Sequence, residues 1–215
     1  MKASLPPLKK TRLPWFDELA QVEIEREVTI QYSINSVVQD SLFHNAQRRY
    51  VFRFPQEREI PTSDVILMMQ GMPFLITKTS GSVGEKLQTV KLTDSTIVIE
   101  DRIAKRERGK ETVTVEDLPY PDKIQETRVR EDIISRRITL KNEVGKDIDL
   151  TVKIVESGDV QLIKVIPEAI KAEKPTFEWK IALKKDTEES IQCEYRIRIE
   201  KIREIEKPKP PMDKD

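Results

Sequence analysis

The stretch at residues 176–201, TFEWKIALKKDTEESIQCEYRIRIEK, decides the fold class. Apolar residues alternate with polar ones on both sides of the polar segment 184–189: first Phe177, Trp179, Ile181 and Leu183, then Ile191, Cys193, Tyr195, Ile197 and Ile199. Because successive side chains of a strand point to opposite faces, this period of two predicts strands with one apolar face. We therefore predict a β-hairpin over 176–201 with one solvated face.

Further strand-length apolar runs predict an all-β chain made of two antiparallel β domains. The continuous run at 65–76 predicts the buried middle of the first sheet. A charge run after Asp101 and the segment 118–121, LPYP, mark the domain boundary. The predicted parts are an extended N-terminal arm (1–16), an N-terminal β domain (17–110), a linker (111–122), a C-terminal β-sandwich domain (123–203) and a flexible tail (204–215).

The chain is rich in charged residues but carries no formal net charge at pH 7. Charged residues make up 35% of the chain, and 38 Lys and Arg balance 38 Asp and Glu, against about 25% charged residues in an average domain. This composition is typical of heat-adapted proteins. The N-terminus predicts no signal peptide, and no apolar run predicts a membrane span. We expect a cytoplasmic protein with no membrane partner.

Few residues offer catalytic chemistry. The chain has one histidine, His44, and one cysteine, Cys193, which the alternation places on an apolar face. A Cys–His pair and a cluster of metal ligands are therefore not expected. The six glycines form no phosphate-binding motif. We predict no enzyme, no catalytic residues, no cofactor and no metal, with a hydrolase using paired carboxylates as the remaining enzymatic alternative.

The first candidate interface lies in the N-terminal arm. Leu13, Trp15 and Phe16 surround Pro14, and the fixed φ of proline suits an arm that wraps or pairs with another chain. Exposed sheet edges accept strands from other chains. These features predict a non-enzymatic binding or scaffold protein that acts through β-sheet surfaces and edges, with protein partners or itself, as a homo-oligomer.

A basic segment supplies the alternative function. Its cations are Arg102, Lys105, Arg106, Arg108 and Lys110, which could contact phosphates of RNA or the ribosome. Interspersed acidic residues dilute this charge, and no aromatic side chains interleave to stack on bases. A ribosome- or RNA-associated factor therefore stays open as the second hypothesis.

The C-terminal half resembles the β-sandwich domain of the mucoidy inhibitor A-like family of uncharacterised proteins. The resemblance rests on a strand ending in Asn142, an alternating strand at 148–154, and a closing W-x-x-x-L … Y-x-I pattern from Trp179 to Ile197. It covers about the last 80 residues. The family's long coiled-coil insertion and its proline after the asparagine are not found here. The resemblance implies an immunoglobulin-like sandwich and a non-enzymatic role, with no catalytic residues to transfer.

Overall fold

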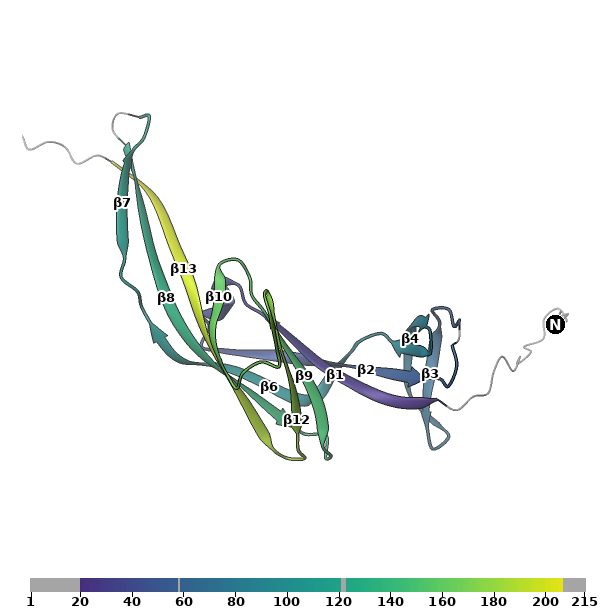
Figure 1. Cartoon of the computed structure of the whole chain (residues 1–215). Helices are drawn as coiled ribbons and strands as arrows, with labels where there is room; N and C mark the ends of the chain where they lie inside the picture. The colour runs from purple at the N-terminus through teal and green to yellow at the C-terminus, as the bar shows by residue number, and fades with distance from the viewer. Residues whose placement is uncertain (1–19, 58, 121–122, 207–215) are drawn as a thin grey trace, which may run out of the picture. The chain divides into compact units, whose positions relative to one another are not determined.

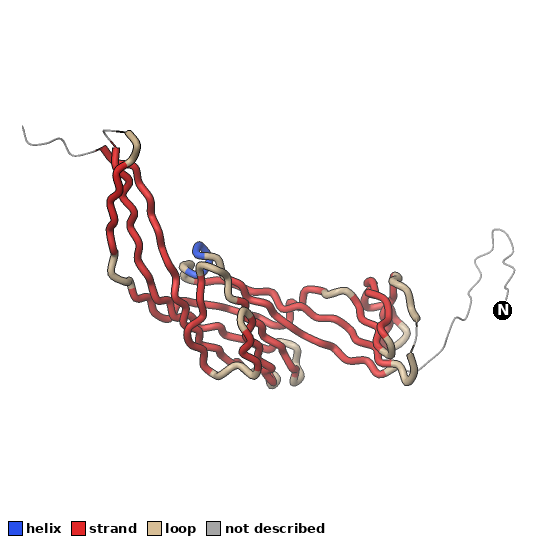
Figure 2. The backbone as a smooth tube through the Cα atoms, turned by 45° about the horizontal axis from the view of Figure 1, so that its top comes forward, coloured by secondary structure: helices blue, strands red, loops and turns tan. Residues whose placement is uncertain are grey.

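The computed structural model describes residues 20–57, 59–120 and 123–206 of the chain (Figures 1 and 2). These residues are nearly all β, with one large mixed sheet and a four-residue helix, α1 (Ile34–Val37). Within them, no helix is long and apolar enough to cross a membrane. They divide into a first unit (20–25 and 49–91) and a second unit (26–48 and 92–206). The strands β1 (Gln21–Gln31) and β2 (Ser41–Arg53) contribute to both units.

The second unit is a sheet whose strands hydrogen-bond in the order β10-β13-β8-β6-β2-β1-β9-β12-β11. The prediction of purely antiparallel sheets is wrong, because β1 and β9 run parallel, with Val28 opposite Val152. The strands not yet given bounds are β6 (Leu92–Glu107), β8 (Lys123–Asn142), β9 (Ile148–Val155), β10 (Val160–Ile166), β11 (Lys171–Glu173), β12 (Thr176–Leu183) and β13 (Glu188–Glu206).

One hydrophobic core holds the second unit together. It takes side chains from strands far apart in the sheet order, such as Ile138 in β8, Val152 in β9 and Ile197 in β13. Trp179 of β12 lies in the same core and donates its indole N–H to the carbonyl of Pro167 at 3.0 Å. Because both ends of the strand order supply this cluster, the sheet folds over a shared core.

The stretch at 176–201 forms two strands, as predicted, but they do not form a hairpin. β12 pairs with β9 and β11, whereas β13 pairs with β8 and β10. Both strands bury one face in the same core, so the polar turn between them crosses from one part of the sheet to another. Alternation reports which face of a strand is buried and carries no information about which strand lies beside it.

Residues 111–122, which we predicted to be a linker, include the strand β7 (Thr112–Asp117). β7 pairs with β8 over Val129 to Ile124, and β13 continues along the other side of β8 as far as Glu206. Residues 204–206, which we assigned to the tail, therefore belong to a strand. The three strands form a ribbon at one end of the second unit (Figure 1). Strands this long and this rich in polar and charged residues are possible here because both faces of the ribbon are solvated.

The first unit contains β3 (Asp64–Met69), β4 (Met72–Val83) and β5 (Lys86–Thr89), which pair in the order β3-β4-β5-β2. Its buried apolar residues are Tyr50, Val51, Phe54 and Leu87. The expected burial of 65–76 is wrong, because one face of β3 and β4 is open to solvent. A two-stranded ribbon covered on one side leaves alternate residues exposed, whatever their hydrophobicity.

Candidate functional site: a buried polar centre and open apolar surfaces

Of the two predicted interfaces, only the basic segment lies within the described residues. Leu13, Trp15 and Phe16 lie outside the described residues. The basic residues lie on the second half of β6 and the loop after it, and their side chains are exposed.

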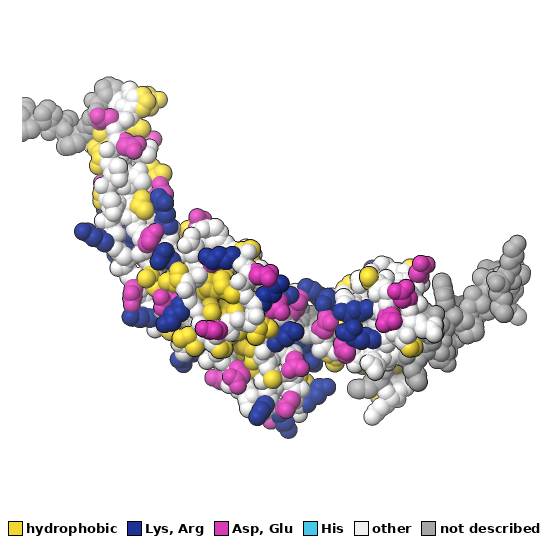
Figure 3. Space-filling model, in the orientation of Figure 1, with side chains coloured by type: hydrophobic (Ala, Val, Ile, Leu, Met, Phe, Trp, Pro, Cys, Tyr) yellow, Lys and Arg dark blue, Asp and Glu magenta, His cyan; other side chains and the backbone are white. Residues whose placement is uncertain are grey.

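Local partners are found for Arg102, Lys105, Arg106 and Arg108 of the basic segment. Arg102 donates to Glu100 at 2.7 Å, Lys105 pairs with Glu107, and Arg108 lies 4.0 Å from Glu111. Arg106 donates to the backbone carbonyl of Val38 at 2.6 Å. The hydrogen bond that Lys105 donates to Glu107, and then the negative charge of Glu107, raise the pKa of Lys105. Figure 3 shows acidic and basic side chains interleaved over the second unit. These pairs reduce the positive potential that phosphate binding requires.

A buried polar centre that our sequence analysis missed lies in the core of the second unit, around Asp101. Arg136 donates Nε–H to Oδ1 of Asp101 at 2.8 Å, and Tyr32 donates its hydroxyl to Oδ2 at 2.5 Å. Nε2 of His44 lies 3.1 Å from the same Oδ2. The centre joins β2, β6 and β8 to Tyr32, the residue that follows β1, and the side chains of both Asp101 and Arg136 are fully buried.

Arg136 extends this centre to the end of α1. Its Nη1 donates to the carbonyl oxygens of Val37 and Gln39, both at 2.7 Å, and its Nη2 donates to the backbone oxygen of Asp101 at 3.2 Å. The guanidinium also lies over the ring of Tyr32, 5.5 Å from its centroid. A buried charge is tolerated when its partner and its donors are all satisfied in this way.

We call the centre a clamp, because its buried ion pair and hydrogen bonds hold neighbouring strands together. Both carboxylate oxygens of Asp101 accept hydrogen bonds from protein groups, Oδ1 from Arg136 and Oδ2 from Tyr32, and the side chain of Arg136 is not exposed. Burial, and then the charge of Asp101, raise the pKa of Tyr32. Burial raises the pKa of the nearby Cys193 thiol to about 12, so at neutral pH this sulfur is protonated and a poor nucleophile.

The sequence does contain a signal for this centre. Asp101 continues the inward phase of Ile97 and Ile99, and Arg136 stands between Ile134 and Ile138 on the buried face of β8. A charged residue in the apolar phase of a strand needs a buried partner of opposite charge. When two strands each carry such a residue, with opposite charges, the two residues are expected to pair. Alternation alone does not show that the two strands are neighbours.

A second ion cluster lies near Asp94 in β6. Arg26 donates to its Oδ2 at 3.0 Å, and the hydroxyl of Thr96 donates to Oδ1 at 2.5 Å. Arg48 lies 3.8 Å from the same Oδ1. Burial alone would raise the pKa of Asp94, but the hydrogen bonds from Thr96, the charge of Arg48 and the hydrogen bond from Arg26 outweigh it and lower the pKa. This cluster fixes β1, β2 and β6 to one another.

An apolar face on the first unit is exposed. Ile66 in β3 and Ile76 in β4 are directly opposite each other and are 60% and 73% exposed. Met68, Met72 and Phe74 continue the same region and are exposed too. We call these five residues the β3–β4 face. Clustered exposed hydrophobic side chains mark sites of protein interaction more often than scattered ones do.

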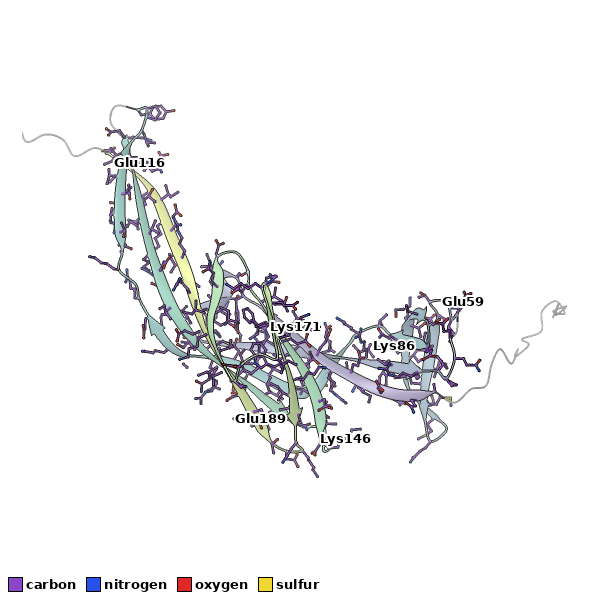
Figure 4. All side chains as sticks on the ribbon, viewed as in Figure 1. Glu59, Lys86, Glu116, Lys146, Lys171 and Glu189 are labelled. Carbon is purple, nitrogen blue, oxygen red and sulfur yellow. The ribbon has the colours of Figure 1, made fainter. Side chains whose placement is uncertain are left out.

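The ribbon of β7, β8 and β13 offers unpaired edges. β10 pairs with β13 only as far as Ile197, so residues 198–206 have a described partner on one side only, in β8. β7 likewise pairs with β8 alone among the described strands. Figure 4 shows side chains pointing outward along this ribbon, including Glu116 in β7. Open edges of this kind can accept a strand from another chain.

Comparison of the chain with protein-family models, with curated proteins and with solved structures found no match.

Proposed function

We propose that the chain is a non-enzymatic binding or scaffold protein that acts through β-sheet surfaces and edges and associates with further copies of itself. The observation that carries this proposal is the β3–β4 face, where five large apolar side chains of one ribbon are open to solvent. The unpaired edges of β7 and β13 support it. Leu13, Trp15 and Phe16 supply apolar groups that such a surface could bind.

The proposal extends to the architecture and setting of the second unit. The shared core under strands from both ends of the sheet order supports an immunoglobulin-like sandwich related to the mucoidy inhibitor A-like family. The cytoplasm is the proposed location, in keeping with the charge-rich composition and the single, buried cysteine. The buried centre at Asp101 has a stabilising role in this account.

The alternative is a ribosome- or RNA-associated factor that uses the basic segment from Arg102 to Lys110. The local pairing of Arg102 and Lys105 with glutamates weighs against it, because those charges must first be freed to bind phosphate. RNA binding through this segment would weaken steeply with salt.

Co-expression of tagged and untagged chains, followed by purification at low and high salt, tests both functions. Self-association predicts that the untagged chain is retained at both salt concentrations. RNA or ribosomal proteins that are retained at low salt and lost at high salt would favour the alternative. Recovery of the tagged chain alone at both salt concentrations would contradict the proposed self-association.

A further inference from the structure

The β3–β4 face has the features of a receptor for an apolar segment. Ile66 and Ile76 form the end of it that lies away from the turn at 70–71, while the alternate residues Leu67 and Leu75 point to the other side of the ribbon and are half-buried. Phe74 already makes an edge-on contact with Tyr50, with ring centroids 6.2 Å apart. Methionine side chains adapt their shape and make favourable contacts with aromatic rings, so Met68 and Met72 suit an aromatic ligand.

Residues 1–19 of the chain lie outside the described part, which begins at Ala20, immediately before β1. The start of β1 belongs to the same unit as the face, and both views show it beside the β3–β4 ribbon (Figures 1 and 2). The ion pair between Glu23 and Arg53, with Nε–Oε1 at 3.1 Å, fixes this start against β2. The described chain therefore begins in the same unit as the apolar face.

The reach of the arm is sufficient. From β1 the sheet continues through β2 and β5 to Thr79 of β4, which is about 14 Å away at roughly 4.8 Å for each strand spacing. Ile76 lies three residues before Thr79, about 10 Å along the strand, so the diagonal distance to the face is about 17 Å. The chain from Leu13 to Ala20, if extended, covers roughly 23 Å. Trp15 and Phe16 are the two aromatic residues of this segment and are flanked by Leu13. Their burial would remove large apolar side chains from water on both partners.

We propose that the β3–β4 face binds the segment Leu13–Phe16, with Trp15 as the anchor. This inference rests on the proposed function, because it names the surface that the arm uses in self-association. The segment and the face can belong to one chain or to two neighbouring copies that exchange arms. The side chains in contact are the same in both cases.

Cysteine cross-linking tests the contact. Trp15→Cys and Ile76→Cys are made as single variants, which are mixed, and together in one chain as a double variant, and a short bismaleimide joins the cysteines. Phe43→Cys replaces Ile76→Cys in the control, because Phe43 is also exposed but lies in the second unit. The native Cys193 is buried and does not compete. We expect Trp15→Cys chains to cross-link to Ile76→Cys chains at least tenfold faster than to Phe43→Cys chains.

The pattern of products distinguishes the contact between segment and face from self-association by arm exchange. A cross-linked dimer in a mixture of Trp15→Cys chains and Ile76→Cys chains supports both the contact and arm exchange. A cross-link formed only within the double variant, with no dimer in the mixture, supports the contact and refutes exchange. Rates equal to those of the Phe43→Cys control, both between chains and within one chain, would refute the contact, whether or not the chain is oligomeric.

Iodide quenching gives an independent measurement. The chain has two tryptophans, and Trp179 is 2% exposed. If Trp15 is docked, both are protected in the native protein. Ile76→Asp should then make about half of the emission quenchable, because a charge on the face disfavours burial of an indole. Phe43→Asp is the matched control. A Trp15 signal that is already fully quenchable in the native protein would overturn the inference.

Discussion

Replacement of Arg136 by methionine tests the role of the buried centre most sharply. The side chain is 0% exposed and makes hydrogen bonds to Asp101, Val37 and Gln39. Its loss leaves the Asp101 carboxylate buried without its cationic partner, which typically costs about 3–5 kcal/mol. For a chain of this length each kcal/mol lowers Tm by about 2–4 °C, so the expected loss is about 6–20 °C.

Urea and thermal unfolding, followed by the emission of Trp179 in the same unit, give the assay. Arg137→Met is the matched control, because Arg137 is the next residue and is exposed, and we expect its effect to stay within about 0.5 kcal/mol. Adding Asp101→Leu to Arg136→Met should recover part of the loss, since no buried charge then remains. A loss below about 1 kcal/mol for Arg136→Met would refute the clamp.

Three further predictions concern single sites. Gly109→Ala should destabilise the second unit, because a Cβ there would lie 1.8 Å from the carbonyl oxygen of Glu131, whereas Gly158→Ala meets nothing within 4 Å and should be neutral in thermal unfolding. The lowered pKa of Asp94 means that its contribution to stability is present above the unfolded pKa of about 3.9 and lost as pH falls through the native value; urea midpoints from pH 6 to pH 3 should therefore fall less in Asp94→Asn than in the native protein. Cys193, whose pKa burial raises to about 12, should resist iodoacetamide at pH 8 until urea unfolds the chain, and rapid labelling of the native protein would show that the thiol is accessible.

The sequence predicted the strands better than their arrangement. Alternation placed Trp179, Cys193 and Tyr195 on buried faces, and all three are buried. It did not predict that β12 pairs with β9 while β13 pairs with β8, because pairing depends on contacts between residues distant in the chain. The same limitation produced the predicted linker at 111–122, where a charged segment is a strand because β8 lies beside it.

The candidate surfaces were also only partly predictable. The apolar run at 65–76 was visible in the sequence, but hydrophobicity alone could not show that Ile66 and Ile76 face solvent. That exposure depends on whether another layer covers the ribbon, which is a property of the whole fold. Conversely, Asp101 and Arg136 were hidden among many surface charges until their strands were placed side by side.

The mass of the full chain in solution, measured by sedimentation over a wide range of concentrations, tests the central claim most directly. The account predicts a mass that is a multiple of the 25.0 kDa chain and that falls toward 25.0 kDa in Trp15→Ala and in Ile76→Asp, but not in Phe43→Asp. A mass of 25.0 kDa for the native protein at every concentration would contradict it.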